Sequence, residues 1–179
     1  MPFELPSDLH PPNKLDIEPG RTHRRWMGRA LELAETAGAA GDVPVGAVVI
    51  GPDQTVLAEA ANRRERDRDP TAHAEILALR QAGQRLGNWH LNDCTLYVTL
   101  EPCPMCAGAV INARLGLLVY GLGDYKSGAG RSVLNIPDGA ASFHRLTVVS
   151  GILEDACKQQ LQGWFRQRRA ENRRIADRQ

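Results

Sequence analysis

The first twenty residues lack a run of apolar side chains and instead contain five prolines. Signal peptides and membrane spans both require an apolar run, so we expect this segment to be neither. Its acidic residues also argue against an organelle transit peptide. We therefore expect residues 1–20 to form a disordered or loosely attached arm, and residues 21–179 to form one domain with its own core.

Cysteine is also scarce: the chain has four, of which Cys103 and Cys106 are three positions apart while Cys94 and Cys157 are isolated. This pattern does not make the disulfide framework of a secreted protein, so a reducing cytoplasm is the expected location. Excess charge is absent as well, since the formal net charge is +1. A near-neutral total does not exclude a nucleic-acid partner, because phosphates respond to local clusters of Lys and Arg.

The spacing of apolar residues predicts helices and strands that alternate along most of the chain. Helices are expected at about 22–40, from a cap at Asp69 or Thr71 to about 86, at 102–114 and from about 154, and strands at 43–51, 54–61, 94–100, 115–121 and 145–151. A hairpin followed by alternating helices and strands implies a partly parallel sheet with helices on both faces, which is an α/β fold. Residues 62–69 and 121–130 are expected to be loops.

His73 and Glu75 stand two residues apart near the start of the second helix. Alone, such a histidine is usually a cap or a surface residue. Cys103 and Cys106 are one helical turn apart, so both sulfurs can leave the same helix face and share one tetrahedral ion. A redox pair or two small buried residues explains the cysteine spacing equally well.

Together, His73 and the two cysteines make three nitrogen and sulfur ligands, the number found in catalytic zinc sites that keep a fourth position for water. Cys94 and Cys157 could close that position, but core roles are favoured for both. If the cysteines fold against the histidine, Glu75 lies near the metal and can accept a proton from bound water without being a ligand. The positive ends of the two helices would favour thiolate over thiol.

The His-x-Glu of residues 73–75 and the Pro-Cys-x-x-Cys of residues 102–106 match the signature of zinc nucleobase deaminases. From about residue 24 to residue 169 the chain resembles the bacterial tRNA-specific adenosine deaminases, in the stretches VPVGAVV, DPTAHAEILALRQ, TLYVTLEPCPMCAGA, GDYKSGA and GIL. This resemblance implies a cytidine-deaminase-like three-layer α/β/α sandwich whose mixed sheet has about five strands. It also implies a zinc-dependent deaminase domain over residues 21–179, one zinc ion per chain and a homodimer.

By the same resemblance, the reaction is hydrolytic deamination of the wobble adenosine to inosine in a tRNA anticodon stem-loop, that of an arginine tRNA. His73, Cys103 and Cys106 are then the zinc ligands. Glu75 is the catalytic proton shuttle, which takes a proton as water attacks C6 of adenine. Asn62 matches an asparagine that holds the flipped purine nucleoside, although a turn residue is the simpler interpretation of its position alone.

Arg64, Asp124 and Lys126 match loop positions that contact the anticodon loop, with a solvated surface as the alternative. In the last helix, Phe165 and Arg169 are four residues apart and therefore share one face. This pair could stack on an unpaired base and hold its phosphate, or Phe165 could pack on the sheet as Trp164 is expected to do. Residues 133–143 resemble the family only loosely, so RNA contacts from that loop stay open.

Two other functions fit the same residues. A deaminase of free guanine, cytosine or deoxycytidylate uses the same zinc site, and it would turn over a free compound without salt-sensitive RNA binding. A zinc-stabilised RNA-binding module without catalysis would have no use for the unligated Glu75. The arginines near residues 21–29 and 166–174 supply a local positive charge, and binding through such charges weakens steeply with salt.

Overall fold

The computed structural model describes residues 19–177. Residues 1–18 of the arm expected at residues 1–20 lie outside this range. The described chain forms a five-stranded sheet in the order β2-β1-β3-β4-β5. Its strands are β1 (Gly46–Ile50), β2 (Val56–Ala61), β3 (Thr95–Leu100), β4 (Leu117–Leu122) and β5 (Thr147–Val149). β1 is antiparallel to β2 and to β3, whereas β3, β4 and β5 run parallel. The expectation of a mixed, partly parallel sheet is confirmed.

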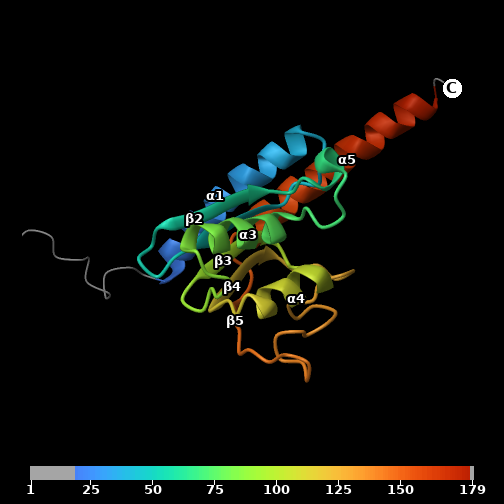
Figure 1. The fold of residues 1–179 in the computed structure, drawn as a ribbon. Helices are drawn as coiled ribbons and strands as arrows, with labels where there is room; N and C mark the ends of the chain where they lie inside the picture. The colour runs from blue at the N-terminus through green and yellow to red at the C-terminus, as the bar shows by residue number, and fades with distance from the viewer. Residues whose placement is uncertain (1–18, 178–179) are drawn as a thin grey trace, which may run out of the picture.

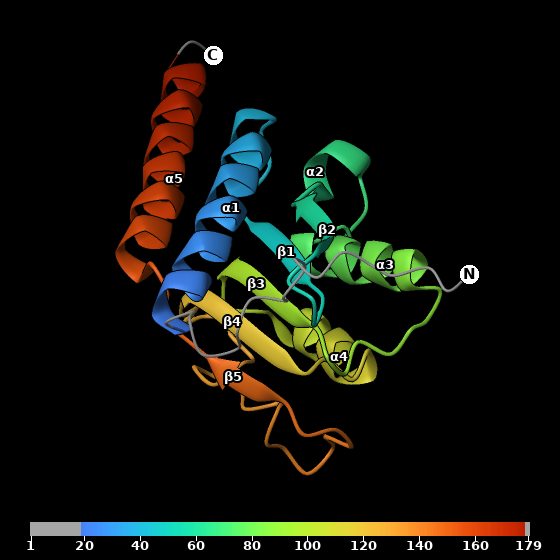
Figure 2. The ribbon, with the colours of Figure 1, turned by 90° about the vertical axis from the view of Figure 1, so that its left-hand side faces the viewer.

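Helices cover both faces of this sheet, as Figures 1 and 2 show. They are α1 (Pro19–Ala39), α2 (Arg64–Asp67), α3 (Ala74–Leu86), α4 (Pro104–Asn112) and α5 (Glu154–Ala176). α1 and α5 pack on one face, against β1 and β4, while α3 lies on the other face beside α4. This is the three-layer α/β/α arrangement that the sequence predicted. None of the helices in the described range is both long and apolar enough to cross a membrane.

The central strands are buried on both faces, and their side chains alternate between two cores. Val48 and Val119 join a cluster with Met27 of α1, whereas the adjacent Val49 and Leu118 join the cluster under α3 and α4. This alternation is the period of two expected for a strand. β1 begins at Gly46, where α1 passes close to the strand. Only glycine fits at this position, because a Cβ there would collide with the carbonyl oxygen of Ala30.

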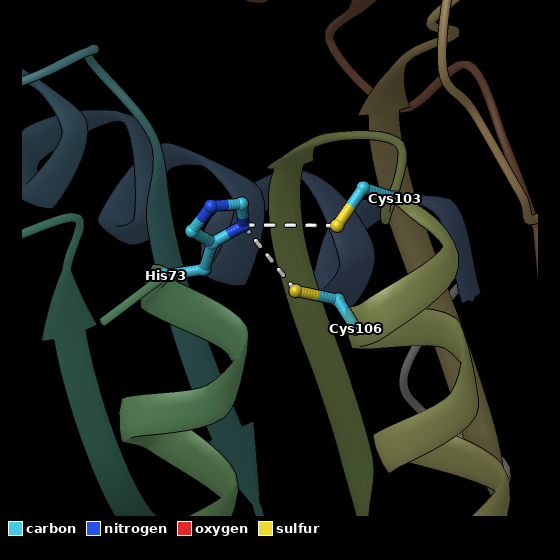
Figure 3. A group of neighbouring side chains, drawn as sticks. All are labelled: His73, Cys103 and Cys106. Carbon is cyan, nitrogen blue, oxygen red and sulfur yellow. Dashed lines mark hydrogen bonds between the residues drawn. The ribbon is translucent and has the colours of Figure 1, made fainter. Parts of the chain in front are cut away.

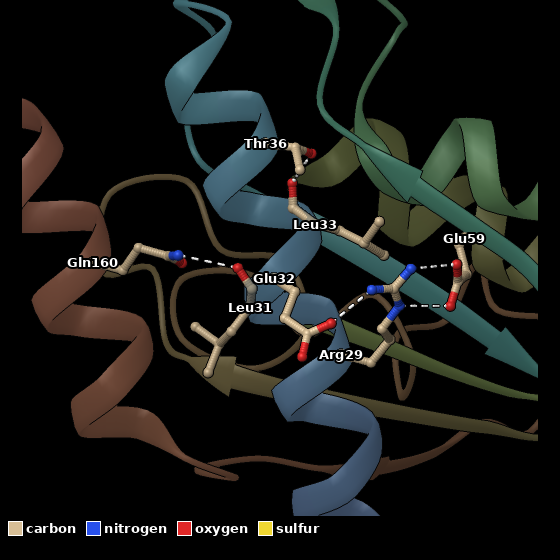
Figure 4. A network of polar contacts seen from close by, with 7 residues as sticks. All are labelled: Arg29, Leu31, Glu32, Leu33, Thr36, Glu59 and Gln160. Atoms are coloured by element: carbon tan, nitrogen blue, oxygen red, sulfur yellow. Dashed lines mark hydrogen bonds and ion pairs between the residues drawn. The ribbon is translucent and has the colours of Figure 1, made fainter.

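Polar contacts tie α1 to both of its neighbours (Figure 4). Arg29 donates from Nε and Nη2 to the carboxylate of Glu59 on β2, each at 2.8 Å, and from Nη1 to Glu32 at 2.6 Å. Gln160 of α5 donates from Nε2 to the carbonyl of Leu31 at 3.0 Å. Because Arg29 and Glu59 remain partly exposed, their ion pair contributes at most about 1 kcal/mol. These contacts orient α1 more than they stabilise it.

The segment before α3 differs from the sequence expectation. α3 begins at Ala74 rather than after a cap at Asp69 or Thr71. Asp69 Oδ1 instead accepts hydrogen bonds from Thr71 N and Thr71 Oγ1, each at 2.7 Å, so it closes the turn that precedes the helix. The expected loop at residues 62–69 also contains the short helix α2. Because α3 starts at Ala74, residue 73, and not residue 71, is its N-cap.

Candidate metal and catalytic site

His73, Cys103 and Cys106 come together from the N-termini of α3 and α4 (Figure 3). His73 and Cys103 are the N-cap residues of their helices, both with extended backbone, and neither side chain makes a capping hydrogen bond. Pro104 occupies the first turn of α4, where its missing N–H is not needed. The two side chains are therefore free to point across the gap between the helices.

The three ligand atoms have the spacing that a tetrahedral ion requires. His73 Nδ1 lies 3.7 Å from Cys103 Sγ and 3.5 Å from Cys106 Sγ, and all three atoms lie within 4.8 Å of one another. Metal–ligand bonds of about 2.0–2.3 Å at tetrahedral angles separate two ligands by roughly 3.5 Å. The residues present therefore fit a metal ion held by one nitrogen and two sulfurs.

The protonation of the two thiols agrees with this interpretation. The pKa of Cys103 is lowered to about 4, first by its hydrogen bond with Cys106 and also by its hydrogen bond with His73, although burial opposes the shift. The pKa of Cys106 is raised, by the same hydrogen bond with Cys103 and by burial. Two thiolates this close repel each other, so both ionise together only when a cation lies between them.

Glu75 is the second residue of α3 and is 4% exposed. It lines the same pocket as His73 and Cys103 but does not belong to the three-residue ligand group. Burial raises the pKa of its carboxyl, which keeps a proton on it at higher pH than on an exposed glutamate. A carboxyl in this position can accept a proton and return it.

One pocket of about 120 Å³ collects most of the site residues predicted from sequence. Asn62, Arg64, His73, Glu75, Cys103 and Asp124 line it, with Val43, Val45 and Leu100 as an apolar wall. Asn62 is buried, and its Nδ2 donates to the carbonyl of Val43 at 3.2 Å. Lys126 is exposed and lies outside this lining, although its backbone N–H donates to Asp124 Oδ1 at 2.9 Å.

The two predicted contact residues of α5 also lie outside the pocket lining. Phe165 is 39% exposed and packs edge-on against Trp164, with ring centroids 5.1 Å apart. Trp164 itself donates from Nε1 to the carbonyl of Gly38 at 3.1 Å and is half-buried, so it packs α5 on α1, whereas the sequence predicted that it would pack on the sheet. Arg169 is exposed in the C-terminal half of α5, the helix whose end extends past α1 in Figure 2.

The remaining two cysteines have core roles, as the sequence favoured. Cys94 is buried in the cluster beneath α3 and α4, and Cys157 is buried in the cluster beneath α1. Burial raises the pKa of both thiols, Cys157 to about 12. Neither belongs to the metal-binding group found among residues 19–177.

Two buried carboxylates beside the pocket had been given no role from the sequence. Asp42, which is 0% exposed, accepts from the backbone N–H groups of Glu65 at 2.7 Å and Arg66 at 3.3 Å, at the start of α2. Glu101 is 2% exposed and lines the pocket. A carboxylate directly after an apolar strand, as in LEPCP, was the one signal that could have pointed to Glu101.

Comparison with known proteins places this chain in a family. The family model of MafB19-like deaminases matches residues 21–169. The tRNA-specific adenosine deaminase of Haemophilus influenzae is 45% identical over 149 residues, which are 83% of this chain and 86% of that protein. A solved structure from studies of A-to-I editing by tRNA:A34 deaminases at the wobble position is 41% identical with a TM-score of 0.74, covering 76% of this chain and 99% of its own. Guanine deaminase from Nitrosomonas europaea is more distant, at 27% identity and a TM-score of 0.69 over 90% of this chain and 98% of its own.

The match to the family model spans most of the described range and includes both helix N-termini of the metal-binding group. The curated relative is matched along most of its own length, so the likeness is not confined to one motif. The chain therefore belongs to the MafB19-like deaminase family and, within it, to the tRNA-specific adenosine deaminases.

Proposed function

We propose that this chain deaminates the wobble adenosine of a tRNA anticodon loop, that of an arginine tRNA, to inosine. The observation that carries the proposal is the position of Glu75, which is buried in one pocket with Asn62 and with His73 and Cys103 of the metal group. A structural metal site has no use for such an unligated carboxylate, whereas a hydrolytic deaminase needs a proton shuttle at this place. The family of the chain supports the same reaction.

His73, Cys103 and Cys106 would hold one zinc ion. Two thiolates and an imidazole bind zinc in preference to harder cations such as Mg²⁺ and Ca²⁺. When bound, zinc would act as a Lewis acid that lowers the pKa of a coordinated water to about 7. The described ligand group contains three residues, which leaves a coordination position for that water.

Glu75 is the group that moves protons. Its carboxylate accepts one proton from the attacking water and delivers it to the ring nitrogen next to C6, and it then accepts the second proton from the oxygen added to C6 and delivers it to the departing amine. Water adds its oxygen to C6 and the C6–N bond breaks, so the products are inosine and ammonia. The raised pKa of Glu75 suits both halves of this transfer, since the carboxyl must first accept the proton and then release it.

Substrate contacts divide between the pocket and the surface around it. The pocket is small compared with the roughly 300–1,000 Å³ of sites that enclose a whole drug-sized ligand, which favours entry of the base alone. Asn62 would hold the purine, and Arg64, Asp124 and Lys126 would contact the flanking nucleotides. Phe165 and Arg169 on α5 would grip an unpaired base and its phosphate.

We also propose a homodimer in the cytoplasm, as the resemblance and the scarce cysteines imply. Trp89, which is 60% exposed, lines an apolar groove between α3 and α4 that is suited to burial against another copy. Sedimentation velocity of the purified protein tests the dimer directly, because a single species of one chain mass would contradict it.

The deciding experiment incubates the zinc-loaded protein with an arginine-tRNA anticodon stem-loop, and separately with free adenosine, cytidine and guanine. Inosine at the wobble position with unchanged free compounds is the expected result. Turnover of guanine alone would instead indicate a free-base deaminase, the activity named for the more distant structural relative. Tight binding of the stem-loop without inosine, with zinc fully loaded, would indicate an RNA-binding module.

A further inference from the structure

Glu101 follows β3 directly and lines the pocket together with the loop of residues 123–132. Its carboxylate accepts backbone N–H groups from three points of that loop: Oε2 from Asp124 at 2.8 Å, and Oε1 from Arg131 at 2.7 Å and Ser132 at 2.9 Å. The acceptor and its donors are separated by 23 to 31 positions in the chain. One buried side chain therefore fastens both ends of the loop.

The loop also fits tightly around this carboxylate. A Cβ at Gly128 would collide with the Glu101 carboxylate and with the carbonyl of Asp124, and a Cβ at Gly130 would lie 3.2 Å from Glu101 Cγ. Gly128 N donates to the Asp124 carbonyl, and Ala129 N donates to the carbonyl of Pro102, each at 2.8 Å. In this arrangement the loop satisfies these donors and packs closely around Glu101.

The carboxyl oxygens of Glu101 accept hydrogen bonds from three backbone N–H groups of the loop, at Asp124, Arg131 and Ser132. The carboxylate oxygens are directed at the loop amides, which separates the role of Glu101 from that of the proton shuttle Glu75.

We propose that Glu101 is a positioning residue that holds the 123–132 loop in its substrate-binding arrangement and thereby sets the affinity for RNA. Asp124 and Ser127 of this loop line the pocket, so their placement depends on the loop backbone. When a loop is competent for only a fraction of the time, the apparent affinity falls by that fraction, and bound substrate restores the competent form. The inference rests on the proposed function for its RNA readout.

The first test compares Glu101→Gln with the matched control Glu59→Gln. Glu101→Gln keeps the size of the side chain but replaces one acceptor oxygen with an NH2 group, which faces a backbone N–H donor of the loop. Glu59→Gln alters a partly exposed carboxylate on β2, away from the pocket. We expect KM for the anticodon stem-loop to rise roughly tenfold in Glu101→Gln, with zinc content and kcat close to wild type. Glu59→Gln should retain the wild-type KM.

The second test perturbs the loop and leaves Glu101 intact. Gly128→Ala places a methyl group against the carboxylate, and Gly28→Ala on α1, where a Cβ meets nothing within 4 Å, is its control. Gly128→Ala should raise KM as Glu101→Gln does, and it decides the question if Glu101→Gln does not fold. Gly28→Ala should leave KM unchanged.

Amide hydrogen exchange gives a readout that needs no RNA. The backbone amides of Asp124, Arg131 and Ser132 should be protected from exchange in the wild type. They should lose this protection together in Glu101→Gln and in Gly128→Ala. A KM within twofold of wild type in both variants, or retained protection of the three amides, would overturn the proposal. So would a loss of zinc with a fall in kcat, which would mean that Glu101 serves the nearby Cys103. Absence of inosine with wild-type protein would contradict the proposed function alone, and exchange would still decide the role of Glu101.

Discussion

His73 and Cys103 are each the N-cap of a helix, α3 and α4, and Glu75 lies in the first turn of α3. Two other segments border the site: residues 62–68, which include the short helix α2, and the 123–132 loop. Buried carboxylates from elsewhere in the chain, Asp42 and Glu101, hold these two segments. We therefore expect the chemistry and the binding of substrate to respond to different mutations.

The largest expected effect is loss of the metal. Cys106→Ala removes a buried ligand from a group of three, so zinc and all measurable turnover should be lost together. Zinc content by atomic emission and inosine formation are the measurements. Cys157→Ala is the control, because it removes a buried cysteine from the core beneath α1 and should keep both. A Cys106→Ala protein that retained one zinc and normal turnover would contradict the ligand assignment.

Glu75→Gln should remove proton transfer and leave the metal bound. The substitution preserves the size of the side chain but removes its ability to accept a proton, so kcat should fall roughly 100 to 10,000-fold. Zinc content and stem-loop affinity should stay near those of the wild type, as measured by atomic emission and fluorescence anisotropy. Full activity in this variant would show that another group is the base.

Phe165→Ala distinguishes the two interpretations of α5. If Phe165 stacks on a base, the variant should lose about 1–3 kcal/mol of RNA binding with kcat unchanged at saturation. Arg169→Ala should then reduce the salt dependence of binding by about one ion, and Arg85→Ala, at an exposed position of α3, is its charge-matched control. Unchanged affinity with a lower melting temperature in Phe165→Ala would instead mean that the ring only packs against Trp164.

The smallest expected effect tests the other buried carboxylate. Asp42→Asn weakens the acceptor for the first amides of α2, so the free energy of unfolding should fall by about 1 kcal/mol, with KM raised modestly and kcat retained. Urea unfolding and steady-state kinetics are the measurements. Asp53→Asn is the control, because Asp53 accepts only from Thr55 within the β1–β2 turn among its described hydrogen bonds. Equal changes of KM in Asp42→Asn and Asp53→Asn would show that Asp42 has no specific effect on substrate binding.

Much of the fold and of the metal-binding group followed from local patterns. The mixed sheet, the helices on both faces and the ligand group were expected from apolar spacing and from residues one helical turn apart. The start of α3 was predicted less well, because Asp69 and Thr71 have the chemistry of helix caps but bond to each other in the preceding turn. Local propensity does not decide between those two uses of one side chain.

By itself, the sequence of this chain predicted the candidate metal ligands and the candidate proton shuttle, because His-x-Glu and Cys-x-x-Cys are local motifs of residue types that carry this chemistry. Only the tertiary structure decided how the pocket is walled. α2 forms where Asp42 meets its first amides, and the 123–132 loop closes around Glu101. Both contacts join residues more than twenty positions apart, so they arise from the packing of the sheet and helices and leave no periodic pattern in the sequence.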